Sequence, residues 1–189
     1  MENHSAASLP QRLMVRLRQQ WRSHLGTVLL VLAVFTGAHF WHTRHLPSGP
    51  LPDLPLLLST GESTTLGAWR ARYPGQPVAL HVWAEWCTIC RVEEHNITRL
   101  QADWPVLTVA MQSGDAPQVQ RVLNQRSLPW ATVVDESGAL SRGLGVQSVP
   151  ALLVLDAQGH LRAASVGYTS EIGMRLRLWW ARAVGQAPA

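Results

Sequence analysis

A short apolar segment followed at once by two closely spaced cysteines constrains the fold more than any other feature of this sequence. Residues Val78–Trp83 (VALHVW) follow Gly-Gln-Pro and predict a buried central strand. Residues 88–103 contain no helix breaker and predict a helix, so the strand ends and the helix begins around Cys87. The Cys87 sulfur then meets the helix dipole and free N–H groups, which favour a thiolate, and Cys90 lies one turn further on the same face.

The two cysteines suit chemistry better than stabilisation. They are the only cysteines in the chain, whereas a disulfide scaffold uses several pairs spread along the sequence. A bridge across two intervening residues closes a tiny loop and removes little entropy from the unfolded chain. A zinc site would need two further ligands, and His81 and His95 do not complete a recognised pattern. The pair therefore predicts thiol–disulfide exchange and no metal site.

The segment around the cysteines resembles a known family. Trp83-Ala-Glu-Trp-Cys87-Thr-Ile-Cys90 is similar to the thioredoxin superfamily, and Arg91 and Glu93 resemble the membrane-tethered TlpA/ResA class. The tail Val166-Gly-Tyr-Thr-Ser-Glu171 is similar to the suppressor-for-copper-sensitivity D-type protein disulfide oxidoreductases. The resemblance runs from about residue 50 to the C-terminus. It implies an α/β fold, a thioredoxin-like mixed sheet with helices on both faces, and protein-disulfide oxidoreductase activity.

The segments that follow alternate between strand and helix patterns, which indicates the same mixed sheet. Predicted strands cover Val106–Met111, Ala131–Val134, Ala151–Leu155 and Leu161–Val166, and predicted helices cover Ala116–Arg126, a turn near Ala139–Leu144 and the C-terminal segment. By the resemblance, residues 111–134 contain the insertion typical of the TlpA/ResA class. One face of the C-terminal amphipathic helix is apolar and consists of Ile172, Leu176, Trp179, Trp180 and Ala183.

The resemblance assigns roles to further residues. It implies a cis peptide bond between Val149 and Pro150, in a loop beside the cysteines whose backbone binds the extended substrate. It also places Glu93 near Cys90, where a partly buried carboxylate accepts the thiol proton. On the residues alone, Pro150 is equally well a trans turn proline. For Glu93 the alternative is an exposed helix residue.

Other residues near the pair leave alternatives open. Trp86 is expected to line the substrate surface, whereas Trp83 fits the core and Glu94 fits an exposed helix position. His81 stands where thioredoxin carries a buried acid, so either it does related proton work or it is a core histidine with satisfied hydrogen bonds. The pair Thr88-Ile89 differs from that of better-known relatives and leaves the reduction potential open, because these two residues tune it.

An apolar segment near the N-terminus predicts a membrane anchor. The charge-free stretch from Ser23 to Thr43 includes the apolar Leu25–Phe40 and has about the 20 residues that span a bilayer, with Trp21 and Trp41 at its ends. Four arginines precede it and one follows closely, which keeps the N-terminus cytoplasmic. The alternative is a cleaved signal peptide, against which the long N-terminal region and the bulky end of the segment argue.

This interpretation gives four parts: a basic cytoplasmic N-terminus at 1–22, an anchor at 23–43, a linker at 44–53 and a thioredoxin-like domain at 54–189. We expect the chain in the bacterial inner membrane, with its domain in the periplasm. The formal charge of +4 lies entirely before residue 50, where five arginines face one acid, while eleven arginines balance eleven carboxylates afterwards. The domain therefore has no basic bias, which excludes a nucleic-acid partner.

The expected function is an enzyme that exchanges electrons with extracytoplasmic protein thiols and disulfides, as a reductant recharged by a membrane electron donor. An oxidant coupled to a membrane acceptor is the alternative within the class. No cofactor beyond the redox-active Cys87–Cys90 disulfide is expected. A different class is a copper or haem handling protein that uses the cysteines as ligands, in copper tolerance or cytochrome c maturation. The lack of Met-rich and His-rich tracts argues against a dedicated copper carrier.

Overall fold

The computed structural model describes residues 24–34, 37 and 49–185. The chain forms two compact units, residues 1–41 and 42–189. In the first unit, residues 24–34 form a helix whose side chains are exposed. None of the helices in the described ranges is both long and apolar enough to cross a membrane. The predicted N-terminus at 1–22 and about half of the predicted anchor lie outside the described residues.

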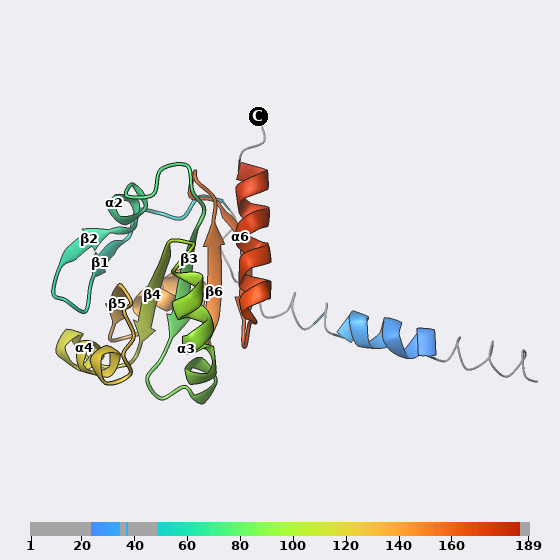
Figure 1. Ribbon diagram of the computed structural model, residues 1–189, viewed down its shortest axis with the longest axis horizontal. Coiled ribbons are helices and arrows are strands. Elements are labelled where there is room, and N and C mark those ends of the chain that lie inside the picture. The colour runs from blue at the N-terminus through green and yellow to red at the C-terminus, as the bar shows by residue number, and fades with distance from the viewer. Residues whose placement is uncertain (1–23, 35–36, 38–48, 186–189) are drawn as a thin grey trace, which may run out of the picture. The chain divides into compact units, whose positions relative to one another are not determined.

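The second unit is built on a five-stranded sheet, shown in Figure 1. The strands are β3 (Val78–Trp83), β4 (Val106–Met111), β5 (Thr132–Asp135), β6 (Ala151–Leu155) and β7 (Leu161–Val166). They lie in the order β5-β4-β3-β6-β7. β3, β4 and β5 run parallel, whereas β6 is antiparallel to both β3 and β7. The predicted mixed α/β sheet is therefore confirmed.

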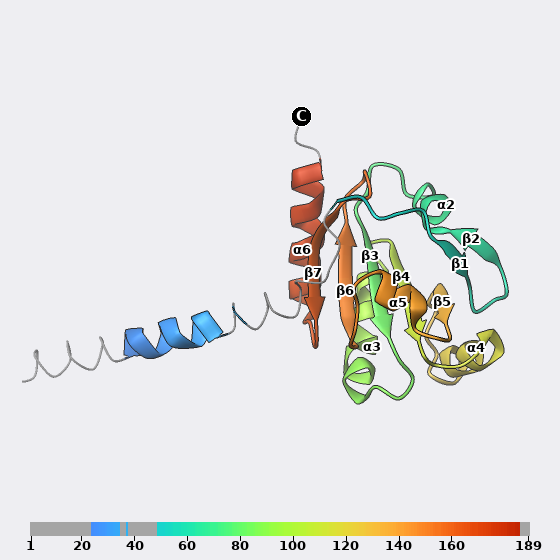
Figure 2. The ribbon, with the colours of Figure 1, turned by 180° about the vertical axis from the view of Figure 1, so that it is seen from behind.

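Helices cover both faces of this sheet. The helices are α2 (Leu66–Arg70), α3 (Thr88–Leu100), α4 (Ala116–Gln125), α5 (Ala139–Gly143) and α6 (Glu171–Gly185). Side chains of α3, α4 and α6 share one core cluster, and those of α2 and α5 share the other. In Figure 1, α3 lies in front of the sheet. Figure 2 views the molecule from the opposite side, and there α5 lies in front of the sheet.

Burial on both faces makes β3 the centre of the sheet. Its apolar side chains alternate between the two clusters, with Ala79 and Trp83 in one and Leu80 and Val82 in the other. The strand pairs with β4 on one side and with β6 on the other. β3 therefore ends at a fixed point, and the chain that leaves it carries the two cysteines into α3.

Before β3 the structure contains elements that the sequence did not reveal. β1 (Pro55–Leu57) and β2 (Ser63–Thr65) form a short antiparallel hairpin, and α2 follows directly. Thr65 caps α2, because its Oγ1 accepts a hydrogen bond from the Ala68 N–H at 3.1 Å. Leu58, just after β1, forms an isolated bridge with β5, so this hairpin segment contacts the edge of the main sheet.

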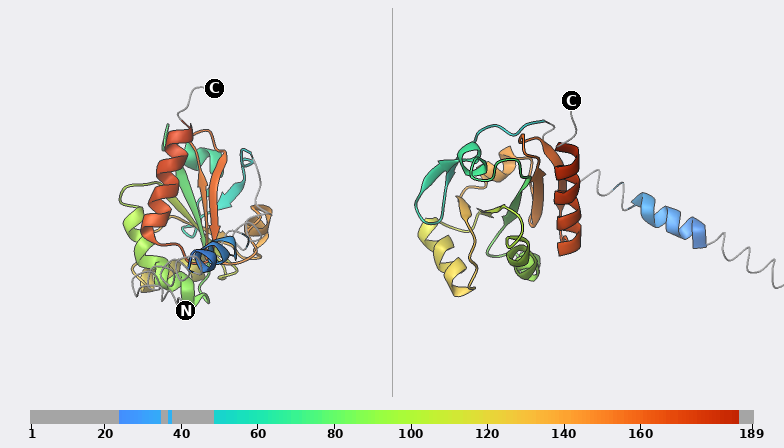
Figure 3. Two further views of the ribbon diagram at one scale, coloured as in Figure 1. Left: turned by 90° about the vertical axis from the view of Figure 1, so that its right-hand side faces the viewer. Right: turned by 45° about the horizontal axis from the view of Figure 1, so that its top comes forward.

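The helix α6 forms as predicted, but its most apolar face points to solvent. The exposed residues of this outer face are Ile172, Leu176, Trp179, Trp180 and Ala183. The buried residues on the opposite side are Met174, Leu178 and Ala181. Figure 3 shows this helix running along the sheet. Helical periodicity identifies an apolar face, but it cannot tell which of two apolar faces meets the core.

The turn between β6 and β7 is held by a buried carboxylate. The Asp156 side chain is fully buried and accepts hydrogen bonds from the backbone N–H groups of Gln158 and His160, both at 2.9 Å, and from Arg162 Nε at 2.6 Å. Burial by itself raises the pKa of the Asp156 carboxyl, but Arg162 and His160 outweigh burial and hold that pKa below its ordinary value. Arg70 of α2 donates to a carbonyl of the same turn at 2.9 Å.

We predict that Asp156→Asn lowers the free energy of unfolding by about 1–3 kcal/mol at neutral pH, because the charge-assisted bond to Arg162 is lost. The lowered pKa of Asp156 sets the sign of the pH dependence. The ionised Asp156 carboxyl contributes to the free energy of unfolding above its unfolded pKa of about 3.9, and this contribution is lost as the pH falls through its lower folded pKa. In denaturant unfolding, the difference between wild type and variant should therefore narrow below about pH 4.

Asp103→Asn is the matched control for this prediction. Asp103 also binds an arginine, Arg175, at 2.7 Å, but its side chain is 58% exposed, so its loss should cost under about 1 kcal/mol. Equal losses for the two variants would contradict the role given to the buried carboxylate.

Candidate active site

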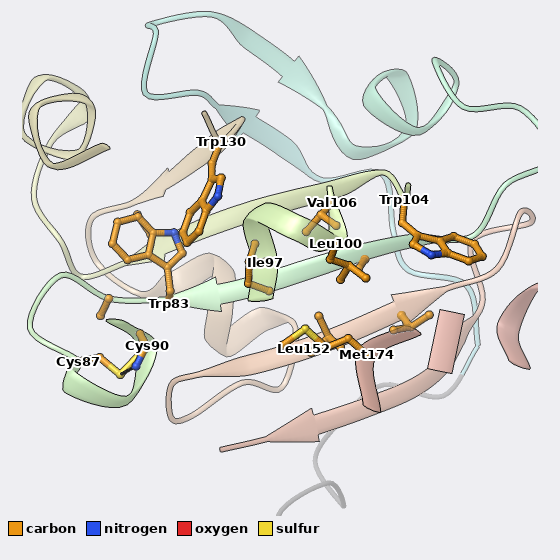
Figure 4. Close-up of a cluster of buried hydrophobic side chains, with 14 of the residues drawn as sticks. Trp83, Cys87, Cys90, Ile97, Leu100, Trp104, Val106, Trp130, Leu152 and Met174 are labelled. Carbon is orange, nitrogen blue, oxygen red and sulfur yellow. Dashed lines mark hydrogen bonds between the residues drawn. A yellow bond between two sulfur atoms is a disulfide. The ribbon is translucent and has the colours of Figure 1, made fainter. Parts of the chain in front are cut away.

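The two cysteines lie where the end of β3 meets the start of α3, as Figure 4 shows. Cys87 is the N-cap residue of α3 and forms a disulfide with Cys90, with their Cα atoms 5.3 Å apart. The Cys90 backbone N–H donates a hydrogen bond to Cys87 Sγ at 3.1 Å. This sulfur therefore meets the helix N-terminus as predicted, and the same N–H group favours a thiolate once the bridge is reduced.

Both sulfurs belong to the core more than to the surface. Cys87 is 6% exposed and Cys90 is 2% exposed, and both lie in the cluster that contains Trp83 and Ile97. Cys87 is the more accessible of the two, although less exposed than a surface thiol. Within the described ranges, no group of three or more His, Cys, Asp or Glu side chains could hold a metal ion.

A loop from another part of the chain completes this end of the sheet. The Val149–Pro150 peptide bond is cis, as the resemblance implied, and it directly precedes β6. Ala151, the first residue of β6, pairs with Val82 near the end of β3, so the loop and the cysteines share one end of the sheet. Val149 packs against the core cluster that contains both cysteines, and the Pro150 carbonyl accepts a hydrogen bond from the Gly167 N–H at 2.8 Å.

Glu93 is a buried carboxyl one turn beyond Cys90 on α3. It is 1% exposed, and among the described residues it forms no ion pair. The Thr169 backbone N–H donates a hydrogen bond to Glu93 Oε1. Burial raises the pKa of Glu93 to about 7, although that N–H lowers it. The interpretation of Glu93 as an exposed residue is therefore wrong, and its carboxyl changes protonation near neutral pH.

The hydrogen-bond partner of Glu93 comes from the segment between β7 and α6. Thr169 is buried, and its Oγ1 forms a hydrogen bond of 2.9 Å with Ser165 Oγ at the end of β7. Sequence reasoning missed Thr169, although it lies within the tail that resembles the D-type oxidoreductases. The contact uses a backbone N–H, which every residue except proline carries, so the side-chain types gave no signal.

The neighbouring acid, Glu94, has a different environment. Its Oε1 binds Arg126 Nη1 at 2.8 Å, and its side chain is 20% exposed. Glu94 is therefore a half-buried ion-pair partner on α3 rather than the exposed residue that was expected. Because the two acids are adjacent and differ in burial, Glu94 serves as a control for substitutions at Glu93.

Exposed apolar side chains stand next to the buried sulfurs. Trp86 is 64% exposed and Ile89 is 51% exposed. The Trp86 indole Nε1 donates a hydrogen bond to the Gln112 carbonyl at 3.2 Å, which holds the ring at the surface. Trp83, in contrast, is 1% exposed and packs edge-on against Trp130, with ring centroids 5.7 Å apart. Trp83 is therefore a core residue, and Trp86 is available to an approaching chain.

A polar cavity lies next to the Trp86 contact, since Gln112, which accepts the Trp86 hydrogen bond, is among its lining residues. Its volume is about 460 Å³, and its lining includes Glu85, Gln112, Gln118 and Arg121. The Glu85 N–H donates to Ser113 Oγ at 2.9 Å, which joins the loop before the cysteines to the segment after β4. The surface around Trp86 and Ile89 is therefore apolar, whereas the neighbouring cavity lined by Glu85 and Gln112 is polar.

His81 is a core residue without a hydrogen bond. It is 1% exposed, and neither ring nitrogen has a hydrogen-bond partner within the described part of the chain. The ring packs edge-on against Trp130, with centroids 6.1 Å apart. Burial lowers the pKa of His81 to about 3, so the ring is neutral at physiological pH. The core interpretation is confirmed, whereas the expectation of satisfied hydrogen bonds is wrong.

We predict that Glu93→Gln makes the protein more stable than wild type at alkaline pH and about equally stable in acid. The folded pKa of about 7 lies above the ordinary 4.5, so the wild type loses about 3 kcal/mol of stability as pH rises between these values. Glutamine does not ionise and keeps an oxygen acceptor for the Thr169 N–H. Denaturant unfolding followed from about pH 4 to pH 8 measures the difference.

Glu136→Gln is the control, because Glu136 is exposed and its substitution should change stability by under about 0.5 kcal/mol at either pH. If Glu93→Gln and wild type lose stability in parallel as the pH rises, the buried carboxyl does not carry the effect.

Comparison with known proteins identifies the family. Residues 47–175 match the Redoxin family. The thiol:disulfide interchange protein DsbE of Pseudomonas aeruginosa is 30% identical over 152 residues, which cover 76% of this chain and 82% of that protein. A thioredoxin-like protein of Haemophilus influenzae is 28% identical over 111 residues, which cover 58% of this chain and 66% of that protein.

Solved structures share the fold. A putative thiol:disulfide interchange protein DsbE from Chlorobium tepidum aligns with a TM-score of 0.63 and 23% identity, over 72% of this chain and 99% of that one. StoA from Bacillus subtilis aligns with a TM-score of 0.55 and 20% identity, over 71% of this chain and 99% of that one. At these identities the likeness shows a thioredoxin-like fold alone. With the family match and the Cys87–Cys90 disulfide, it follows that the chain belongs to the Redoxin family and is a thioredoxin-like thiol–disulfide oxidoreductase.

Proposed function

We propose that the protein reduces disulfides of extracytoplasmic proteins, with Cys87 as the attacking cysteine and Cys90 as the resolving one. The observation that carries this proposal is the hydrogen bond from the Cys90 N–H to Cys87 Sγ at the start of α3. A helix N-terminus lowers the pKa of a thiol, and the thiolate is the species that attacks a disulfide. The P. aeruginosa relative is named a thiol:disulfide interchange protein, which supports protein thiols and disulfides as the substrate class.

The proposed exchange has two steps and moves two electrons to the substrate. The Cys87 thiolate attacks one sulfur of the substrate disulfide, forms a mixed disulfide and releases the other sulfur as a thiolate. Cys90 then loses its proton and attacks Cys87 Sγ, which restores the Cys87–Cys90 bridge and releases the second substrate sulfur. A membrane electron donor returns two electrons to the bridge. The two sulfurs supply all of this redox chemistry, so we propose no further cofactor.

In the second step, Glu93 receives the Cys90 proton. Its carboxyl lies one turn beyond Cys90 on α3, is buried, and has a pKa of about 7. A general base works best when its pKa is close to the operating pH. The Thr169 N–H holds one carboxyl oxygen of Glu93, so the other oxygen takes the proton.

The substrate chain binds across Trp86, Val149 and Pro150. Trp86 offers an exposed indole beside the disulfide, and the cis-proline loop lies at the same end of the sheet. An extended chain that passes Val149 gains backbone hydrogen bonds, as in other cases where a peptide adds to exposed backbone. The apolar Ile89 between the cysteines favours substrates with apolar residues next to their disulfide.

A membrane anchor holds this domain on the extracytoplasmic side of the bacterial inner membrane. The proposal rests on the apolar Leu25–Phe40 and on the arginines that precede it. The described helix at residues 24–34 carries the exposed apolar side chains Leu29 and Leu30, which suit the hydrocarbon interior of a bilayer. An anchored domain can meet a membrane electron donor in the plane of the same membrane.

We predict that Cys90→Ala accumulates covalent adducts with substrate proteins, whereas Cys87→Ala accumulates few and has little activity. Without Cys90 the mixed disulfide at Cys87 is not resolved, and without Cys87 the remaining thiol is the more deeply buried one. Thiol-trapped extracts compared with and without reductant on gels measure the adducts. Adducts in Cys87→Ala alone would reverse the two roles. Insulin reduction that survives each substitution, without adducts in either variant, would show that Cys87 and Cys90 do not carry the exchange.

We predict that Glu93→Gln slows insulin disulfide reduction several-fold near neutral pH, with dithiothreitol as the electron donor. Loss of a general base costs about 100-fold in typical cases, but thiols need less help than hydroxyls. Wild-type activity should rise with pH through about 7, where Glu93 becomes able to accept a proton, and the variant should lack this rise. Glu94→Gln is the control and should follow wild type. Superimposable profiles for wild type and Glu93→Gln would remove Glu93 from the mechanism.

A further inference from the structure

The outer face of α6 is a large apolar surface that the proposed chemistry does not use. Ile172, Leu176, Trp179 and Trp180 are 71%, 63%, 58% and 52% exposed, and the exposed Ala183 lies among them. The helix packs on the sheet through its opposite side, and of the outer side chains Trp179 also touches the core, edge-on against Trp104 with ring centroids 5.7 Å apart. Contiguous exposed apolar patches on soluble proteins mark sites of interaction.

Arginines flank this outer face on both sides. At about 100° per residue, Arg175 and Arg182 lie along one edge of the outer face and Arg177 lies along the other. Arg175 is neutralised by Glu171 and by Asp103, at 2.9 and 2.7 Å. Among the described residues, neither Arg177 nor Arg182 has a carboxylate within ion-pair distance. An apolar stripe with tryptophan, bordered by arginine, is typical of helices that lie in a membrane interface.

The predicted linker at residues 44–53, here called the tether, joins the domain at the end of the sheet where α6 ends. Leu51 N–H donates to the Gly159 carbonyl, and Leu161 N–H donates to the Gly49 carbonyl, both at 3.1 Å. A Cβ placed on Gly185 would lie 3.0 Å from the Asp156 Cβ, so the last turn of α6 touches this same turn between β6 and β7. Five residues, 44–48, separate the proposed anchor from Gly49, and they span at most about 18 Å.

We propose that the outer face of α6 rests on the lipid surface, with Trp179 and Trp180 in the interface and Arg177 and Arg182 at lipid phosphates. The argument from the tether rests on the proposed anchor. A second copy is a poorer occupant, because both edges carry arginine and any face-to-face pair would bring arginine edges together. An anionic bilayer offers apolar chains to the exposed side chains of α6 and phosphates to the arginines on both edges.

This arrangement gives the disulfide a defined place relative to the membrane. The chain runs along β6 from Pro150, at the disulfide end, to Asp156, at the tether end. α6 runs along the same sheet beside β6 and β7 (Figures 1 and 3). When α6 lies flat on lipid, the end with Cys87 therefore points along the bilayer surface, on the same membrane as the proposed electron donor.

Photo-crosslinking in vesicles tests the proposal. The full chain is reconstituted in vesicles of phosphatidylethanolamine and phosphatidylglycerol, with p-benzoylphenylalanine in place of Leu176 or, as a control, of the exposed Gln125 on α4. We expect lipid adducts at position 176 and none at position 125. Added Ile172→Ser and Trp180→Ser substitutions, both at exposed positions, should remove most of the adduct while insulin reduction stays at the wild-type rate.

The outcomes separate the contact with lipid from the anchor. Lipid adducts in equal yield at both positions, adducts to a second copy, or no adduct at position 176 would each overturn the proposal. In native membranes, an adduct to another protein in place of lipid would do the same. Alkaline carbonate extraction tests the anchor by itself. If carbonate extracts the protein from the membrane but position 176 still forms lipid adducts, the contact of α6 with lipid exists without the anchor. If the protein stays in the membrane but forms no lipid adducts, only the anchor exists.

Discussion

The packing of β3 between two strands and two core clusters decides where the reactive sulfur stands. A strand buried on both faces has no freedom to shift its register or direction, so the residue that opens the next helix is fixed as well. That residue is Cys87, in an N-cap position that proteins usually give to Ser, Thr, Asp or Asn. The sulfur is thus part of the architecture of α3, and the core that holds the strand also positions the nucleophile.

The parts of the site that follow from local signals could be predicted from sequence, and the parts that need distant segments could not. The strand Val78–Trp83, the helix start at Cys87 and the cis bond before Pro150 depend on neighbouring residues or on a recognisable motif. The hydrogen bond that holds the Glu93 carboxyl comes from the Thr169 backbone, 76 residues away in sequence. The direction of the apolar face of α6 depends on how the whole helix rolls against the sheet, which periodicity does not encode.

Two ionisable side chains buried without a counter-charge shape the interior on the disulfide side of the sheet. Burial raises the pKa of Glu93 and lowers that of His81. Both effects favour the neutral form, because a charge loses its hydration in the interior. Below about pH 7 this region therefore contains little charge. In such a medium a single hydrogen bond, such as that from the Cys90 N–H to Cys87 Sγ, is electrostatically stronger than it is in water.

The turn around Asp156 lies at the end of the sheet opposite the disulfide. Both Gly49, where the described part of the domain begins, and Gly185, the last residue of α6, contact this turn or the start of β7. For anyone who wishes to immobilise or label this domain, both points of attachment are therefore on the side away from the chemistry. A surface or a fluorophore joined through either of them leaves Cys87 and the cis-proline loop unobstructed, so the domain is suited to display on a solid support as a working catalyst.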